Sequence, residues 1–307
     1  MVAVTDLYEK YTITKDGQLM LGKAEKEQIE TVWERFQAQL PQCGYCEMGL
    51  SCRNCVMGPC RVDPFGEGPQ RGVCGADADI IVARNLGRMI AAGAASHSDH
   101  GRDLVEVLAG VAEGSAIGYK IRDEAKLKRV AGEYNITTDN KEILTIAGEL
   151  ADAMMEDYGM RKKAIQLVDR APQKRREVWN KFNLTPRGID RETSEMMHRT
   201  HMGVDNNWIT LLLQGMRNAL SDGWGGSMIA TEVSDILFGV PTPRPTTVNA
   251  GVLKANQVNS VVHGHNPVVS EMVSLACQSK ELLDLAAAKG AKGINLVGVC
   301  CTGNELL

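Results

Sequence analysis

Apolar side chains recur at helical spacing along most of the first 240 residues. The segment 76–111 shows the pattern clearly, because Leu104, Leu108 and Val111 fall on one face of a helix. Three later segments repeat it: KEILTIAGELADAMMEDYG, NNWITLLLQGMRNAL and MIATEVSDILFG. The glycine-dense SDGWGGS is expected to separate the last two helices. Nearer the N-terminus, KEQIETVWERFQAQL predicts one amphipathic helix in a polar lead-in.

The pattern changes after the proline-rich GVPTPRPTTVN. VNSVVHGHNP begins as a β-branched strand, VVSEMVSLACQSKELLDLAAAKG has helical spacing, and GINLVGVCC reads as a second strand. Strand, helix and strand in this order predict a parallel pair. We therefore expect an α + α/β protein, with a helical domain over 1–240 and the start of a Rossmann-like α/β domain over 241–307. A lone unit cannot close its own sheet, so we expect a longer protein of which this is the N-terminal portion.

Composition places the chain among folded, water-soluble proteins. Apolar residues make up 44% and charged residues 23%, and the net charge of −4 leaves no basic surface for nucleic acid. The start of the chain shows no secretory signal, and the most apolar stretch, 80–95, is interrupted by Arg84 and Arg88. We expect no membrane span and a cytoplasmic location. Thiols stay reduced there, so clustered cysteines are more often metal ligands than disulfides.

Six of the nine cysteines lie within 32 residues, at Cys43, Cys46, Cys52, Cys55, Cys60 and Cys74. A zinc site needs only four ligands, and the two C-x2-C pairs stand closer together than zinc ribbons place them. Iron–sulfur clusters take four thiolates from such a run, and the last four cysteines fit that plan. Zinc and disulfides remain the less favoured alternatives. The first two cysteines, left over, could complete a cluster with a second copy across a two-fold axis, or serve a structural role.

Three stretches resemble one family. They are CRNCVMGPCRVDPFGEGPQRGVCGADADIIVARNLGRMIAAGAASHSDHGRD, VVHGHNP and GVCCTGNE, in this order, and they resemble motifs of the nickel-dependent, anaerobic carbon monoxide dehydrogenases. The resemblance implies the reversible reaction of CO with water to give CO2, two protons and two electrons. It implies a homodimer, a helical domain followed by Rossmann-like domains, and a ferredoxin-like electron carrier. It leaves an acetyl-CoA synthase partner open.

The resemblance also divides the cysteines between two clusters. It assigns a [4Fe–4S] cluster, called the B cluster, to the last four of them. It assigns Cys43 to an intersubunit D cluster, whose second ligand would fall at Ser51 in the common C-x7-C pattern of the family. Serine offers no thiolate, so Cys46 is the expected second ligand, in a shorter pattern that goes with a [2Fe–2S] cluster.

A third cluster, the catalytic Ni–Fe–S C cluster, is implied by the later motifs. The resemblance gives it His265 and Cys301 as ligands and leaves His263 as a structural neighbour. Cys300 is expected in a buried strand and Cys277 in the core, within a helix. The remaining ligands of the family would fall beyond residue 307. The 307-residue chain alone is therefore predicted to be inactive.

Proton chemistry is expected at SHSDHGRD. His97 and His100 are three residues apart on a helix, and histidine titrates near neutral pH. The resemblance makes His97 a base near the catalytic cluster and Asp222 a carboxylate of the active site. Asp103 and Glu106 stand where some members of the family continue the row with histidines.

Two other classes of protein remain as alternatives. A hybrid-cluster oxidoreductase would share the helical domain and the cysteine-rich start, but HGHNP and CCTGNE favour the dehydrogenase. A non-catalytic module for electron transfer, zinc binding or redox sensing would need only the cysteine-rich loop.

Overall fold

The computed structural model describes residues 8–159, 163–240, 250–263 and 267–300. Its longest element is α4, Ala78–Glu113, which confirms the helical pattern expected over 76–111. Asp77 begins α4 by accepting a hydrogen bond from the backbone N–H of Ile80, and Gly114 ends it with a φ of +78°, which favours glycine. Neither α4 nor any other helix in the described residues has an apolar stretch long enough to cross a bilayer.

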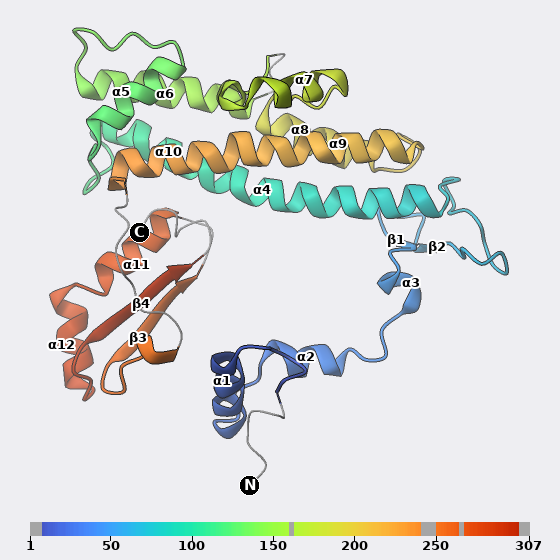
Figure 1. Cartoon of the computed structure of the whole chain (residues 1–307), viewed down its shortest axis with the longest axis horizontal. Coiled ribbons are helices and arrows are strands. Elements are labelled where there is room, and N and C mark those ends of the chain that lie inside the picture. The colour runs from blue at the N-terminus through green and yellow to red at the C-terminus, as the bar shows by residue number, and fades with distance from the viewer. Residues whose placement is uncertain (1–7, 160–162, 241–249, 264–266, 301–307) are drawn as a thin grey trace.

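Further helices bury one large apolar core together with α4, and α6, α8, α9 and α10 pack directly along α4. The helices around this core are α5 Glu124–Glu133, α6 Ile143–Tyr158, α7 Gln173–Lys181, α8 Ile189–Arg199, α9 Trp208–Ser221 and α10 Ser227–Phe238, with a 3₁₀ turn at Gln166–Arg170. Leu104 and Leu108 of α4 pack in this core with Leu150, Met154 and Ile229, all fully buried. The helices expected from the three later segments are therefore confirmed. Figure 1 shows α6 and the α9–α10 pair alongside α4.

The glycine-dense segment between α9 and α10 does not separate them, contrary to expectation. Asp222–Gly226 forms a π-helical turn that carries the chain from α9 directly into α10. Glycine allows this turn to lie against α4, because a Cβ on Gly226 would stand 3.0 Å from the backbone nitrogen of Ser98. The two helices run in line in Figure 1. A single extra residue per turn of this kind is common at functional sites.

The N-terminal segment also differs from expectation. The single helix expected over 26–40 is wrong. The structure has α1, Lys15–Lys26, and α2, Val32–Ala38, because Thr31 and Glu34 form a capping box that starts a new helix. Tyr11 and Trp33 stack with ring centroids 5.0 Å apart. Both helices lie apart from the helical core in Figure 1.

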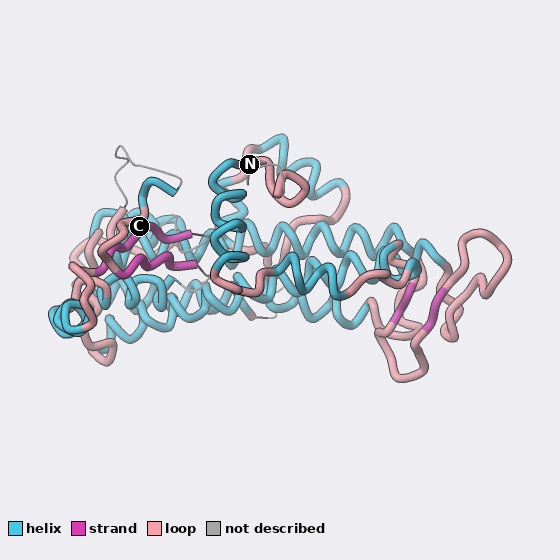
Figure 2. Tube along the Cα trace, turned by 90° about the horizontal axis from the view of Figure 1, so that it is seen from below, coloured by secondary structure: helices cyan, strands magenta, loops and turns pink. Residues whose placement is uncertain are grey.

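The cysteine-rich loop contains a short helix and a small hairpin. Helix α3 spans Gly44–Glu47, and β1, Ser51–Cys52, pairs antiparallel with β2, Cys60–Arg61. Figure 2 shows this strand pair at the opposite end of the long helices from the second strand pair, β3–β4. The hairpin thus sits at the N-terminal end of α4.

The expected strand–helix–strand unit is present at the C-terminal end. Strands β3, Val258–His263, and β4, Ile294–Cys300, run parallel, as expected. The single helix expected between them is two helices, α11 Pro267–Ala276 and α12 Lys280–Ala288, because Ser279 caps α12 through its side chain. Cys277 therefore lies in the turn after α11, half-buried, rather than inside a helix. A Rossmann-like completion of this sheet, and the division at 240/241, stay predictions.

Candidate functional site

Four of the predicted cysteine ligands line one pocket. Cys52 and Cys60 are register partners in the β1–β2 hairpin, Cys55 lies in the turn between them, and Cys74 comes three residues before the cap of α4. The pocket is lined by Cys52, Asn54, Cys55, Gly58, Cys60, Gly72, Val73, Cys74, Ala76, Ile81, Arg84 and Met202. The hairpin and the start of α4 thus bring the four thiols together.

Glycines and a buried aspartate shape the loop around these thiols. A Cβ on Gly58 would lie 3.2 Å from the carbonyl oxygen of Cys52 and from the nitrogen of Cys60, so the chain passes too close for a larger residue. Asp63 accepts backbone N–H bonds from Phe65 and Glu67 at 2.9 and 2.8 Å. The bond from Phe65 contributes most to lowering the pKa of the Asp63 carboxyl. These contacts help to fix the conformation of the loop.

Helix α4 clamps the same loop with two polar side chains. Asn85 donates to the carbonyl oxygens of Gly49 and Ser51 at 2.9 and 3.0 Å. Arg84, only 1% exposed, donates from Nη1 to the sulfur of Cys74 at 3.4 Å. Burial alone would raise the pKa of the Cys74 thiol, but the hydrogen bond and the charge of Arg84 outweigh it and lower that pKa.

Sequence reasoning treated Arg84 only as a charge that interrupts an apolar stretch. The available signal was its position, because Arg84 follows Ile80, Ile81 and Ala83 on the face of α4 that is buried. A charge on the buried face of a helix requires a partner. The sequence pattern therefore indicated that Arg84 has a buried partner, although it did not show which group that partner is.

The other two cysteines of the cluster lie on the surface. Cys43 caps α3 and Cys46 lies within it, and both are exposed. Ser51 donates from Oγ to the sulfur of Cys46 at 3.2 Å. Hydrogen bonds from the backbone and the thiol of Cys46 lower the pKa of the Cys43 thiol. The pair is thus accessible to a second molecule, and Ser51 supports it as a hydrogen-bond donor.

Two of the three residues predicted for proton chemistry are brought together. His97, on α4, places Nδ1 2.8 Å from Oδ1 of Asp222, at the start of the π-helical turn. Ser227, the first residue of α10, has its hydroxyl 3.2 Å from both atoms and donates to the carboxylate. Both side chains of the pair are about one quarter exposed, at 23% and 25%. Ser227 was missed from the sequence, where it appeared only as the end of SDGWGGS.

His100 faces a different space. It lines a pocket between α4 and α8 whose other polar residues include Asp99, Arg102 and Asp190. Arg102 donates from Nη2 to both carboxylate oxygens of Asp190 at 2.9 and 3.0 Å. The third predicted residue is thus adjacent to an ion pair rather than to Asp222.

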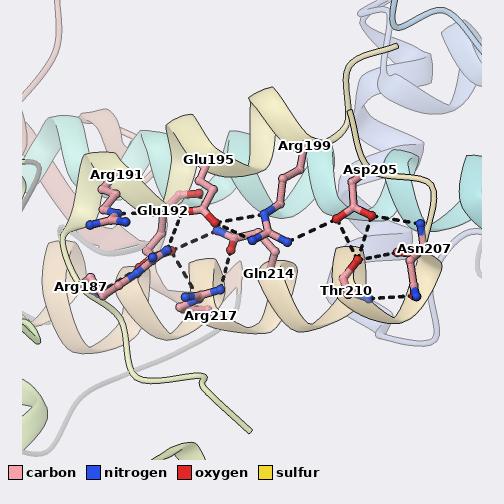
Figure 3. A network of polar contacts seen from close by, with 10 residues as sticks. All are labelled: Arg187, Arg191, Glu192, Glu195, Arg199, Asp205, Asn207, Thr210, Gln214 and Arg217. Carbon is pink, nitrogen blue, oxygen red and sulfur yellow. Dashed lines mark hydrogen bonds and ion pairs between the residues drawn. The ribbon is translucent and has the colours of Figure 1, made fainter. Parts of the chain in front are cut away.

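A network of charged residues connects α8 and α9 (Figure 3). Glu192, fully buried, accepts from Nε and Nη2 of Arg187 at 2.9 Å each, and from Gln214 at 3.0 Å. Arg199 bridges Glu195 and Asp205, with Nη1 3.3 Å from Oδ2 of Asp205. The network ends close to the cysteine pocket, since the carbonyl oxygen of Asp205 accepts from Arg84 at 3.0 Å.

Two predicted ligands, His265 and Cys301, lie outside the described residues. Strand β3 ends at His263, which is exposed, and its register partner on β4 is Cys300. Within the described residues, no group of three or more His, Cys, Asp or Glu side chains converges as a site for a single metal ion. The four cysteines line a pocket, and their thiols do not converge on the position of a single ion.

The comparisons with known proteins agree with one family. The chain matches the model of the Prismane/CO dehydrogenase family over residues 50–307. It is 56% identical over 300 residues to carbon monoxide dehydrogenase 1 of Methanosarcina acetivorans. The aligned region covers 98% of this chain and 48% of that protein. This chain, with its four-cysteine pocket at the start of its longest helix, therefore belongs to the Prismane/CO dehydrogenase family. The chain spans about half the length of the curated relatives it matches.

Solved structures point to the same family. A Ni-free carbon monoxide dehydrogenase from Thermococcus sp. AM4 superposes with a TM-score of 0.89 and 53% identity, covering 96% of this chain and 47% of that one. An acetyl-CoA synthase/carbon monoxide dehydrogenase, described with NiZn[Fe4S4] and NiNi[Fe4S4] clusters in its alpha subunits, superposes with a TM-score of 0.88 and 41% identity. That match covers 100% of this chain and 45% of the other. These likenesses confirm the resemblance to carbon monoxide dehydrogenases.

Proposed function

We propose that this chain is part of an anaerobic carbon monoxide dehydrogenase that converts CO and water to CO2, two protons and two electrons. The observation that carries the proposal is the pocket lined by Cys52, Cys55, Cys60 and Cys74, in a chain of this family. Such a pocket suits a group that receives electrons and passes them on.

The pocket fits a [4Fe–4S] cluster on its donor set and its surroundings. Four thiols are the ligands such a cluster requires. Its irons occupy separate corners, so the four sulfurs need not converge on one point, as they would around zinc. The Nε of Arg84 is buried without a hydrogen-bond partner among the described residues, and a sulfur-rich, negatively charged group would supply an acceptor. We assign the B cluster to this pocket.

Cys43 and Cys46 would hold the D cluster together with the same residues of a second subunit. Two thiolates cannot complete a cluster alone, but an isologous contact repeats each residue across the two-fold axis. The exposure of both thiols is compatible with such sharing. The C-x2-C spacing favours a [2Fe–2S] cluster, and a homodimer follows from the shared ligands.

His97 would act as the base for the protons that CO oxidation releases. In the tautomer that the 2.8 Å contact favours, Nδ1–H of His97 donates a hydrogen bond to Asp222, and Nε2 is the acceptor nitrogen. A base held in this way takes a proton from water as it reacts, and passes it on toward solvent. His100, three residues along α4, would extend the path. A Ni–Fe–S cluster held in part by His265 and Cys301 would supply the redox centre for CO.

Partners follow from the same chemistry. The electrons must leave to a carrier, for which a ferredoxin-like protein is our proposal. One structural relative is an acetyl-CoA synthase/carbon monoxide dehydrogenase, which keeps an acetyl-CoA synthase partner open as a second proposal.

The test is CO-dependent reduction of a viologen dye by the dehydrogenase that contains this chain, produced without oxygen and analysed for nickel and iron. We expect CO oxidation, and expect Cys60→Ser to remove the B-cluster signal in electron paramagnetic resonance while Cys277→Ser keeps it. Brown protein without nickel or CO oxidation would favour the hybrid-cluster alternative, and colourless zinc protein the binding-module alternative. The 307-residue chain alone, reconstituted with iron, sulfide and nickel, should not oxidise CO.

A further inference from the structure

Arg84 is a buried cation without a matching anion. Its side chain is 1% exposed, and its guanidinium contacts the thiol of Cys74, the carbonyl oxygen of Asp205 and the amide oxygen of Asn206. No carboxylate of the described residues pairs with it. Burying a charge is costly unless an opposite charge accompanies it. The arrangement therefore requires an anion close to Cys74.

Asp205, the acidic residue that Arg84 contacts, does not supply that anion. Asp205 presents only its backbone carbonyl to Arg84, at 3.0 Å. Its carboxylate instead accepts from Arg199 at 3.3 Å, from the hydroxyl of Thr210 at 2.8 and 2.9 Å, and from the backbone of Asn207 at 3.0 Å, as Figure 3 shows. Its negative charge is therefore directed away from Arg84. The neutral oxygens of Asp205 and Asn206 hold the guanidinium in place without cancelling its charge.

We propose that Arg84 is a positioning residue that sets the reduction potential of the cluster in the four-cysteine pocket. The proposal rests on the assignment of a [4Fe–4S] cluster to that pocket. With four thiolate ligands, the oxidised cluster has a net charge of −2, and one added electron makes it −3. No proton is taken up and no bond is broken. A fixed positive charge stabilises the more negative state more strongly, so Arg84 raises the potential.

Burial makes this effect large. Charges interact several times more strongly near a protein interior than in water, because little solvent screens them. A hydrogen bond to a ligand sulfur acts in the same direction, since bonds to the sulfurs and solvent exposure are known controls of cluster potential. Both effects come from one side chain here, through Nη1 at 3.4 Å from the sulfur of Cys74. A relay that accepts electrons more readily is the functional consequence.

The experiment is a redox titration of the anaerobically produced dehydrogenase, with dithionite as reductant, followed by the B-cluster signal in electron paramagnetic resonance. We expect Arg84→Gln to make reduction of the cluster about tenfold less favourable, which corresponds to a midpoint about 59 mV lower for one electron. Arg84→Lys keeps the charge and should restore most of the difference. Arg88→Gln is the matched control, because Arg88 lies one turn along α4 and bonds to the hydroxyl of Thr200 at 3.0 Å rather than to a thiol. Its midpoint should stay near that of the unmodified enzyme.

Asn206→Asp provides a second variant that leaves Arg84 unchanged. It places a carboxylate 2.8 Å from Nη2, where the amide oxygen now lies, and so offsets the positive charge at almost constant shape. We expect a lower midpoint potential in this variant too. If the Arg84→Gln protein contains no cluster, Asn206→Asp alone tests whether the charge of Arg84 sets the potential. An unchanged midpoint in either loaded variant overturns the proposal for Arg84. Absence of the signal in the unmodified enzyme would instead refute the cluster assignment itself.

Discussion

His97 and Asp222 are separated by 125 residues in the chain, yet Nδ1 of the imidazole and Oδ1 of the carboxylate lie 2.8 Å apart. The contact exists because the π-helical turn Asp222–Gly226 brings the end of α9 against α4. Ser227 supports the carboxylate from the next residue after the turn. In the proposed reaction His97 would be the base and Asp222 would orient it, while Ser227 donates the hydrogen bond that holds the carboxylate.

Replacing the carboxylate tests this arrangement. We expect Asp222→Asn to lower the rate of CO oxidation about 10- to 100-fold, because an amide can donate to Nδ1 and so favour the wrong tautomer of His97. The iron and nickel contents should not change. Steady-state kinetics with CO as the varied substrate, together with metal analysis, measure both quantities.

Asp169→Asn is the matched control for this change. Asp169 forms an ion pair with Arg176 at 3.1 Å on the surface, where its side chain is 72% exposed. The Asp169→Asn variant should oxidise CO at the rate of the unmodified enzyme. The rate of Ser227→Ala should lie between those of Asp222→Asn and Asp169→Asn. A normal rate in Asp222→Asn would show that the contact has no part in the reaction.

The surface cysteines allow a test of the shared cluster. We expect Cys46→Ser to remove the D cluster, with a loss of about two irons per dimer, because serine does not replace a thiolate ligand. The B-cluster signal should persist, since Cys52, Cys55, Cys60 and Cys74 line a separate pocket. Iron analysis and Mössbauer spectroscopy distinguish the two clusters.

Ser51→Ala is the control for that experiment. It removes the hydrogen bond from Oγ to the sulfur of Cys46, at 3.2 Å, but leaves both thiols in place. The cluster should be retained. A full iron content in Cys46→Ser would disprove the assignment of Cys46, and a loss of four irons per dimer would disprove the two-iron cluster.

The long helices were predictable because their signal is local. The apolar spacing of Leu104, Leu108 and Val111 reports one buried face, and that face is buried in the structure. The break between α1 and α2 was not predicted, although Thr31 and Glu34 carry the signature of a capping box. Apolar periodicity across 26–40 gave the opposite expectation, and the local hydrogen bonds of the cap prevailed.

The site was predictable in its residues but not in its contacts. The spacing of Cys52, Cys55, Cys60 and Cys74 indicated one group of ligands, and the hairpin brings them to one pocket. The bond between Arg84 and Cys74 depends on how the loop packs against α4. No local pattern reports such a tertiary contact. His97 and Asp222 were identified by resemblance, while their hydrogen bond depends on a π-helical turn where a break was expected.

The buried ion pairs of α8 and α9 predict an acid-sensitive stability. Burial alone would raise the pKa of the Glu192 carboxyl, but bonds from Arg187 and Gln214 outweigh it and lower that pKa. A lowered pKa in the folded state stabilises the protein above the unfolded value of about 4.3. That contribution is lost as the pH falls through the folded pKa.

Glu192→Gln is expected to cost about 3–5 kcal/mol in the free energy of unfolding near neutral pH, because it removes the carboxylate that pairs with the buried guanidinium of Arg217 and with Arg187. The difference from the unmodified protein should shrink as the pH falls from the unfolded pKa of about 4.3 toward the lowered pKa of the folded carboxyl, where the native side chain also protonates. Denaturant unfolding of the apoprotein at several pH values measures this. Glu177→Gln, on the exposed surface of α7, should cost less than about 0.5 kcal/mol. A difference that is constant with pH would contradict the role of the charge.

Two glycines of α4 offer a matched pair for the contact between α4 and the π-helical turn. A Cβ on Gly101 would meet the hydroxyl of Tyr158 and stand 2.7 Å from the carbonyl oxygen of Gly226, whereas a Cβ on Gly93 would meet nothing within 4 Å. We expect Gly101→Ala to destabilise the protein by about 1–3 kcal/mol through overpacking. Gly93→Ala should stabilise it by about 0.5–1 kcal/mol through helix propensity.

The same substitution should also affect the reaction, because the carbonyl oxygen of Gly226 belongs to the turn that begins with Asp222. Pushing that turn away from α4 would lengthen the contact between Asp222 and His97. Gly101→Ala should therefore lower the rate of CO oxidation, while Gly93→Ala leaves it unchanged. Thermal unfolding and steady-state kinetics of the two variants supply the comparison. Equal stability and equal rates for both would mean that the close approach of α4 to the turn does not position the pair.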